Sequence, residues 1–106
     1  MQSAVTSVLE VDGQVIGYSA LVQKPEGLFL DKLFVDPTWI GVGHGKRLWL
    51  HAVEQARSLG VSTLHIDADP NAAPFYTAMG ARWIREIEMD WPDWRLQVFE
   101  FPLGMS

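Results

Sequence analysis

Hydrophobic and polar residues alternate along the first third of the chain, a pattern typical of half-buried strands. One β-branched run at residues 8–11 leads into Asp12-Gly13, and a second run covers residues 15–22. Asp-Gly between two such runs indicates a tight hairpin, because residues in that turn must tolerate positive φ. A turn containing proline and glycine then precedes a third run at residues 28–35. The pattern therefore predicts three consecutive strands.

The hydrophobic period changes after a glycine-rich loop at residues 41–45. Apolar side chains then recur at the spacing of one helical face, namely Leu48, Ala52, Val53, Ala56 and Leu59. This spacing predicts an amphipathic helix that Gly60 ends. A short apolar run at residues 61–67 follows the helix. Strand, helix and strand in this order predict a right-handed crossover between two parallel strands.

A second, shorter helix is expected between Asn71 and Gly80. We expect Asn71 to cap it, because an asparagine side chain can accept from a free N–H group at a helix start. Two further strands, at residues 82–88 and 96–101, complete the order β-β-β-α-β-α-β-β. The predicted fold class is α/β, with a central mixed, mostly antiparallel sheet in one domain that spans residues 1–106.

Composition narrows the function classes. The 106 residues carry a net charge of -5 and include no cysteine, which excludes disulfides, thiolate metal sites and cysteine nucleophiles. An acidic surface repels phosphate backbones, so we expect no nucleic acid partner, whereas it suits a cationic substrate. The sequence lacks a secretory signal pattern and any apolar run near the roughly 20 residues of a membrane span. We therefore expect a cytoplasmic protein without a membrane partner.

The glycine-rich loop is a candidate anion site. Gly41, Gly43 and Gly45 allow the backbone to approach a ligand closely, and the helix start behind them presents free N–H groups and a positive dipole end. Lys46 adds positive charge. Neither the P-loop pattern G-x-x-x-x-G-K-[ST] nor the dinucleotide pattern G-x-G-x-x-G matches the sequence here. On its own, a glycine cluster of this kind is more often a flexible turn without a ligand.

Two motifs, in the right order, resemble those of the GNAT superfamily of N-acetyltransferases. The first, Ile40-Gly41-Val42-Gly43-His44-Gly45, resembles the family's acyl-CoA-binding motif Q/R-x-x-G-x-G/A, with Ile40 where the family usually has Gln or Arg. The second, residues 71–80 (NAAPFYTAMG), resembles the family's short helix with Asn, Ala, Phe-Tyr and Gly. The resemblance implies a GNAT-like acyl-CoA N-acyltransferase fold that is N-terminally truncated, because family members usually have a strand and two helices before the first hairpin.

The same resemblance implies acetyl-CoA as co-substrate. It places the backbone of the third strand against the amide-bearing arm of CoA, and the N–H groups of the glycine loop around its pyrophosphate. The cofactor-binding residues that it implies are Leu33, Phe34, Val35, Gly41, Val42, Gly43, His44, Gly45, Lys46, Asn71, Phe75 and Tyr76. His65, Asp67 and Asp69 alternate in one predicted strand region, but no zinc-type spacing occurs, so we predict no metal.

Tyr76 and Asp31 are the candidate catalytic residues. By the resemblance, Tyr76 is the general acid that meets the leaving thiolate; the alternative is a packed aromatic side chain. An amine with a pKa near ~10 must lose a proton before it attacks. Asp31 is the candidate base, because strand alternation places it on the face of Leu33 and Val35. A solvent-facing or salt-bridged carboxylate is an equally good interpretation of Asp31.

The expected activity is transfer of an acetyl group from acetyl-CoA to a primary amine, by direct attack in a ternary complex. The acceptor is a small amine or a peptide amine. The alternative is a non-catalytic acyl-CoA-binding or interaction module derived from the same fold. Residues 86–94 are rich in acids and tryptophan, and we expect them to form a homodimer contact or to border the acceptor site.

Overall fold

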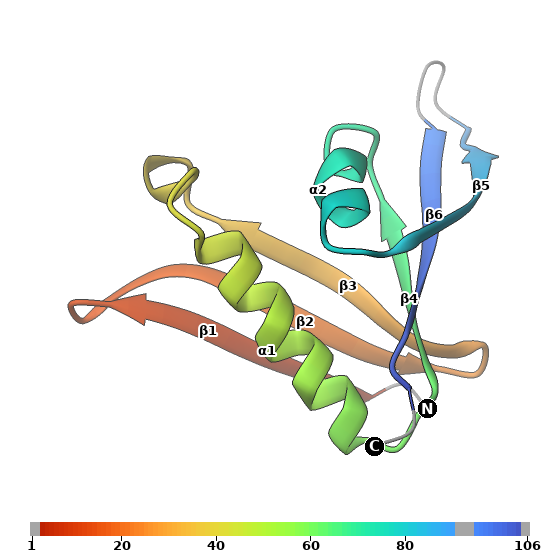
Figure 1. Ribbon diagram of the computed structural model, residues 1–106, viewed down its shortest axis with the longest axis horizontal. Helices are drawn as coiled ribbons and strands as arrows, with labels where there is room; N and C mark the ends of the chain where they lie inside the picture. The colour runs from red at the N-terminus through yellow and green to blue at the C-terminus, as the bar shows by residue number, and fades with distance from the viewer. Residues whose placement is uncertain (1–2, 91–94, 105–106) are drawn as a thin grey trace.

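The computed structural model describes residues 3–90 and 95–104. Within them the chain forms six strands, two α-helices and one 3-10 turn, in the predicted order (Figure 1). The elements are β1 (Ser3–Val11), β2 (Gln14–Lys24), β3 (Gly27–Val35), η1 (Pro37–Trp39), α1 (His44–Ser58), β4 (Thr63–Ala68), α2 (Ala73–Ala78), β5 (Arg82–Glu88) and β6 (Arg95–Pro102). Neither helix in this part of the chain is long and apolar enough to cross a membrane.

All six strands join one sheet, in the order β1-β2-β3-β4-β6-β5. Among these strand pairs only β3 and β4 run parallel, and the other pairs are antiparallel. The prediction of a mixed, mostly antiparallel sheet with one parallel crossover is therefore confirmed. Strand β6 follows β5 in the chain but lies between β4 and β5, so the last strand occupies an inner position of the sheet.

Helix α1 packs on β2 and β3. Its buried residues are Leu48, Trp49, Ala52, Val53 and Ala56. The prediction that Leu59 continues this apolar face is wrong, because the helix ends there: Leu59 is the C-cap residue and is 49% exposed. Gly60 follows with a φ of 80° and ends the helix as predicted. Trp49 packs in the same core cluster as Tyr76 of α2, so both helices cover the same face of the sheet.

Strands β3 and β4 separate after a short paired stretch. They pair only where residues 28–30 meet residues 64–66, although β3 continues to Val35 and β4 to Ala68. Figure 1 shows the two strands diverging, with α2 beside the open end. The backbone groups of β3 beyond Leu30 that face β4 therefore have no strand partner on that side.

A β-bulge interrupts β3 at Asp31. Ala20 pairs with Lys32 and Leu21 pairs with Leu30, so Asp31 has no cross-strand partner on β2. Asp31 and Lys32 are consequently exposed one after the other. An extra residue in one strand shifts its alternation by one position. The prediction that strict alternation places Asp31 on one face with the later residues of β3 is therefore wrong.

Helix α2 begins one residue later than predicted. Its N-cap is Ala72, and no side-chain cap comes from Asn71. The Ala72 N–H group instead donates to the Asp69 carboxylate, with 2.9 Å between nitrogen and oxygen. The prediction that Asn71 caps this helix is thus wrong. Asp69, three residues before the N-cap residue, supplies this acceptor, and Asn71 is exposed.

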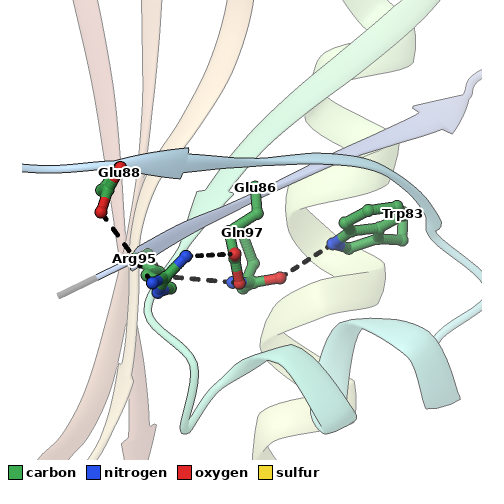
Figure 2. A network of polar contacts seen from close by, with 5 residues as sticks. All are labelled: Trp83, Glu86, Glu88, Arg95 and Gln97. Atoms are coloured by element: carbon green, nitrogen blue, oxygen red, sulfur yellow. Dashed lines mark hydrogen bonds and ion pairs between the residues drawn. The ribbon is translucent and has the colours of Figure 1, made fainter. Parts of the chain in front are cut away.

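A polar network ties β5 to β6 on the sheet surface (Figure 2). The Trp83 indole N–H donates to Gln97 Oε1 at 2.8 Å, and Gln97 Nε2 donates to Glu86 at 2.9 Å. Arg95 donates to the other oxygen of Glu86 at 3.0 Å. The hydrogen bonds from Gln97 and then from Arg95 lower the pKa of Glu86. This network includes the start of the predicted homodimer or acceptor segment, of which residues 91–94 lie outside the described residues.

Candidate active site

The glycine loop positions the start of α1. Gly41 and Gly43 have φ values of 94° and 88°, which side-chain-bearing residues rarely adopt. A Cβ added at either position would meet no atom within 4 Å, so backbone conformation, and not space, requires glycine there. Gly43 is the N-cap residue of α1 and makes no side-chain cap bond. The first N–H groups of α1 have no partner within a helix, and they remain open to an anion.

Gly45 has a different reason to be glycine. A Cβ at Gly45 would lie 3.2 Å from Cε1 of Phe75. A side chain at this position would push the Phe75 ring away from the first turn of α1 by a few tenths of an ångström. This contact fixes the distance between the glycine loop and the helix that carries Tyr76.

An apolar cleft of about 360 Å³ lies where the splayed end of β3, the start of α1 and α2 meet. Its lining residues are Leu33, Val35, Ile40, Gly41, Gly43, Gly45, Lys46, Ala72, Phe75 and Tyr76. Eight of these residues belong to the predicted cofactor-binding set. The fold therefore brings together side chains and backbone from three separate segments of the sequence.

Four predicted cofactor residues do not line this cleft. Phe34 borders a neighbouring hollow, and Val42 and Asn71 are exposed. The His44 ring packs edge-on against Trp39, with 5.7 Å between ring centroids. Its Nδ1 is buried and has no hydrogen-bond partner among the described residues.

Two residues that line the cleft were not predicted. Ile40 stands at the family's Gln/Arg position, and sequence reasoning treated it as a loss of a polar contact and not as an apolar wall. Ala72 lies four residues before Tyr76, and the Tyr76 N–H donates to its carbonyl at 3.3 Å. That spacing places both residues on one side of α2, a signal that could have found Ala72.

Tyr76 is buried at the inner end of the cleft. It is 6% exposed, and its ring packs against Trp49, Phe75 and Phe99 with centroids 5.3 to 6.0 Å apart. Its hydroxyl forms no hydrogen bond with a described residue. Burial, and after it the negative charge of Asp69, raises the pKa of Tyr76 to about 12. The phenol therefore stays protonated at neutral pH, as a hydrogen-bond donor.

A neighbouring hollow of about 210 Å³ shares Leu33, Ala72 and Tyr76 with the cleft, and we call it the acidic hollow. Its lining residues are Tyr18, Asp31, Lys32, Leu33, Phe34, Asp67, Ala68, Asp69, Ala72 and Tyr76. The predicted catalytic pair, Asp31 and Tyr76, thus borders one hollow. Asp31 forms no ion pair with a described residue.

His65 lies away from both hollows. Its ring stacks on Phe29 with 5.0 Å between centroids, and its Nδ1 lies 3.8 Å from a carboxylate oxygen of Glu100. In the part of the chain that the structure describes, no three His, Asp or Glu side chains form a group that could hold a metal ion.

Comparison with known proteins places this geometry in a family. Residues 2–81 match the Acetyltransferase (GNAT) family. Glucosamine 6-phosphate N-acetyltransferase of Trypanosoma brucei brucei is 29% identical over 77 residues, which cover 66% of this chain and 52% of that protein. This chain therefore spans about half the length of that relative.

Solved structures share the fold at low sequence identity. An acetyltransferase from Bacillus cereus superimposes with a TM-score of 0.83 at 23% identity, covering 95% of this chain and 74% of that one. The ribosomal-protein-S18-alanine N-acetyltransferase of Escherichia coli gives a TM-score of 0.83 at 18% identity, with 97% and 71% covered. These likenesses show the fold, and the sequence match over residues 2–81 shows that the chain belongs to the GNAT acetyltransferase family.

Proposed function

We propose that this protein transfers an acetyl group from acetyl-CoA to a primary amine, by direct attack in a ternary complex. The observation that carries the proposal is the early separation of β3 from β4. It opens an apolar cleft between an unpaired strand edge and an uncapped helix start, and a buried phenol lies at the inner end of that cleft.

The residues of the cleft suit both parts of CoA. The backbone of β3 beyond Leu30 is free to pair with an extended, amide-bearing arm, as with an added strand. The N–H groups at the start of α1 suit the pyrophosphate, and Lys46 adds a positive charge there. When it is bound, acetyl-CoA supplies an acetyl group that is activated as a thioester.

Tyr76 stabilises the leaving sulfur by donating a hydrogen bond. Its pKa of about 12 lies about 3.5 units above that of an ordinary thiol, so complete proton transfer to a thiolate is uphill by roughly 5 kcal/mol. A hydrogen bond to the developing negative charge carries no such cost. The pKa thus refines the role of general acid into that of a hydrogen-bond donor.

Asp31 accepts the proton that the amine loses, directly or through water. It borders the same hollow as Tyr76 and has no ion-pair partner among the described residues. In the balanced reaction the N–C bond forms as the C–S bond breaks. One proton leaves the nitrogen, and the sulfur takes up a proton from solvent to end as a free thiol.

Calorimetric titration with acetyl-CoA tests the proposal, with ATP and NAD as controls. We expect selective binding of acetyl-CoA. The ligand should raise the free energy of unfolding by about 2.7 kcal/mol when its concentration reaches a hundredfold its dissociation constant. Release of free thiol in the presence of an amine then measures transfer. Binding without turnover of any amine would refute transfer and favour a non-catalytic acyl-CoA-binding module. No binding would refute both.

A further inference from the structure

The acidic hollow carries more negative charge than the proposed reaction needs. Asp31 comes from the β3 bulge, Asp67 lies in β4, and Asp69 directly follows that strand. Lys32 is the one basic residue in the described lining. None of the three carboxylates forms an ion pair with a described residue. The lining therefore contains three negative groups and one positive group.

Tyr76 brings a hydrogen-bond donor to the edge of this hollow. Its side chain is 94% buried, since 6% of it is exposed, and it borders the acidic hollow. The hydroxyl has no hydrogen-bond partner in residues 3–90 and 95–104. The hydroxyl is not among the fully buried side-chain atoms without a partner, which in the described residues are Ser19 Oγ and His44 Nδ1, so it can be reached from the hollows that Tyr76 lines. The phenol is therefore placed to meet a polar group that occupies the hollow.

Aromatic rings complete the lining. Tyr18 and Phe34 pack together with 5.6 Å between ring centroids, and both border the hollow. The faces of aromatic rings attract ammonium groups. Carboxylates and aromatic rings are the groups that attract ammonium cations, and the hollow contains both.

The reacting nitrogen alone does not account for this charge. That nitrogen must be neutral when it attacks, and each nearby carboxylate favours its charged form. Asp31 suffices to accept the proton. Asp67 and Asp69 would hinder deprotonation unless a second cation neutralises them. We therefore propose that the acidic hollow selects an acceptor amine that carries a second positive charge, an inference that rests on the proposed acetyl transfer.

Three amines of one carbon length test this selectivity. They are 1,4-diaminobutane, 4-aminobutan-1-ol and 4-aminobutanoate, which differ only in the charge at the far end. We expect kcat/KM for the diamine to exceed that for the amino alcohol by about tenfold at low salt, from one partly screened charge pair. The amino acid is expected to be the poorest acceptor. The diamine preference should shrink as ionic strength rises.

Substitutions assign the selectivity to the hollow. We expect Asp67→Asn and Asp69→Asn to reduce the diamine preference severalfold, mainly through KM, whereas Asp12→Asn should leave it unchanged. Asn at position 69 keeps an oxygen that can accept from Ala72 N–H, so the hydrogen bond in the turn before α2 is kept. Asp12 is a matched control, because it lies in the β1–β2 turn with a φ of 52°, which asparagine also tolerates.

Each outcome decides between the two proposals. Acetylation of any of the three amines supports the proposed function. The selectivity is overturned if the ratio of kcat/KM for the diamine to that for the amino alcohol is one or less. It is also overturned if both variants and added salt leave that ratio unchanged. If no amine is acetylated, the proposed function fails, and calorimetric binding of the same amines decides the second question. Binding of the diamine that Asp67→Asn weakens would support a cation site, and absence of that binding would overturn it.

Discussion

The cleft and the acidic hollow meet at Tyr76 but are built in different ways. The cleft has an apolar lining whose polar groups come mainly from backbone, at the unpaired edge of β3 and at the start of α1. The acidic hollow is lined by charged side chains and aromatic rings. A site built from backbone depends on glycines and on strand geometry, whereas a site built from side chains can change with single substitutions.

This difference separates the two ligands of the proposed reaction. A co-substrate common to a family suits a backbone site, since backbone groups are the same in every sequence. An acceptor that differs between family members suits a side-chain site. Tyr76 serves both sides, because it lines both hollows. Substitutions can therefore be directed at the cleft, at the acidic hollow, or at Tyr76, where the two meet.

The largest effect is expected at the junction. Tyr76→Phe removes the hydrogen-bond donor but keeps the ring, so kcat should fall about a hundredfold, a typical loss for a proton or hydrogen-bond donor at the reacting atoms. Calorimetry should show nearly unchanged affinity for acetyl-CoA, which would confirm that the cleft is intact. A kcat equal to that of the wild type would assign Tyr76 to packing alone.

On the cleft side, Gly43→Ala should cost both stability and ligand affinity. A Cβ at its positive φ costs about 1–2 kcal/mol of unfolding free energy, and a distorted helix start should weaken acetyl-CoA binding about tenfold. Gly13→Ala is the matched control, because Gly13 also has a positive φ and open space around its Cβ position. Urea denaturation should give similar losses for both variants, and calorimetry should show weaker binding only for Gly43→Ala. Equal affinity in both would exclude the helix start from the binding site.

The raised pKa of Tyr76 predicts a loss of stability in alkali. Below pH 10 the phenol is protonated in the folded and the unfolded chain. Between pH 10 and about 12 the unfolded chain loses this proton first, so the free energy of unfolding falls as pH rises. At pH 11 the loss should be about 1.4 kcal/mol. Urea denaturation at pH 9 and pH 11 measures it as the difference from Tyr76→Phe, in which this loss should be absent. If the free energy of unfolding fell equally with pH in the wild type and in Tyr76→Phe, the pKa of Tyr76 would not be raised.

The smallest effect is expected at Lys46. Lys46→Met should weaken acetyl-CoA binding by about three- to fivefold, because an exposed charge is largely screened by solvent. The affinity should also depend less on salt. Lys24→Met changes the net charge equally at a distant turn, where Lys24 lies over the Phe29 ring, and should leave binding unchanged. If both variants lost the same affinity for acetyl-CoA, the effect would come from the overall charge of the protein and not from the position of Lys46.

Sequence reasoning recovered the cleft more fully than the acidic hollow. The three glycines and residues 71–80 carry local signals, and they sufficed to predict the element order and eight of the cleft residues. Asp31 approaches Tyr76 only because β3 has a bulge and separates from β4, which depends on pairing between distant segments. Asp67 and Asp69 join Asp31 for the same reason, and alternation within one strand cannot show it.

The errors at the helix ends have local physical causes. Asn71 is a residue type that caps helices well, but the N-cap residue of α2 is Ala72, which makes no side-chain cap bond, and the Asp69 carboxylate accepts from Ala72 N–H in the turn after β4. Leu59 fits the apolar period of α1, but the helix ends one residue earlier, at Ser58. Trp49, which the predicted apolar face did not include, is buried, and its ring packs against Tyr76 and Phe101. No local signal in the sequence indicates the sheet order either, in which β6 lies between β4 and β5.

Because β3 and β4 pair over only a few residues, the sheet is held together less firmly between them than between its other strands. One half contains β1, β2 and β3, the other contains β4, β6 and β5, and between the two strands at the junction the ladder spans only residues 28–30 and 64–66. Because so short a ladder joins the halves, we expect them to tilt relative to each other most easily at this junction. A ligand that fills the gap between the separated ends of β3 and β4 would hold the two halves of the sheet together. Amide hydrogen exchange should then slow in both halves at once, and not only at the residues that contact the ligand.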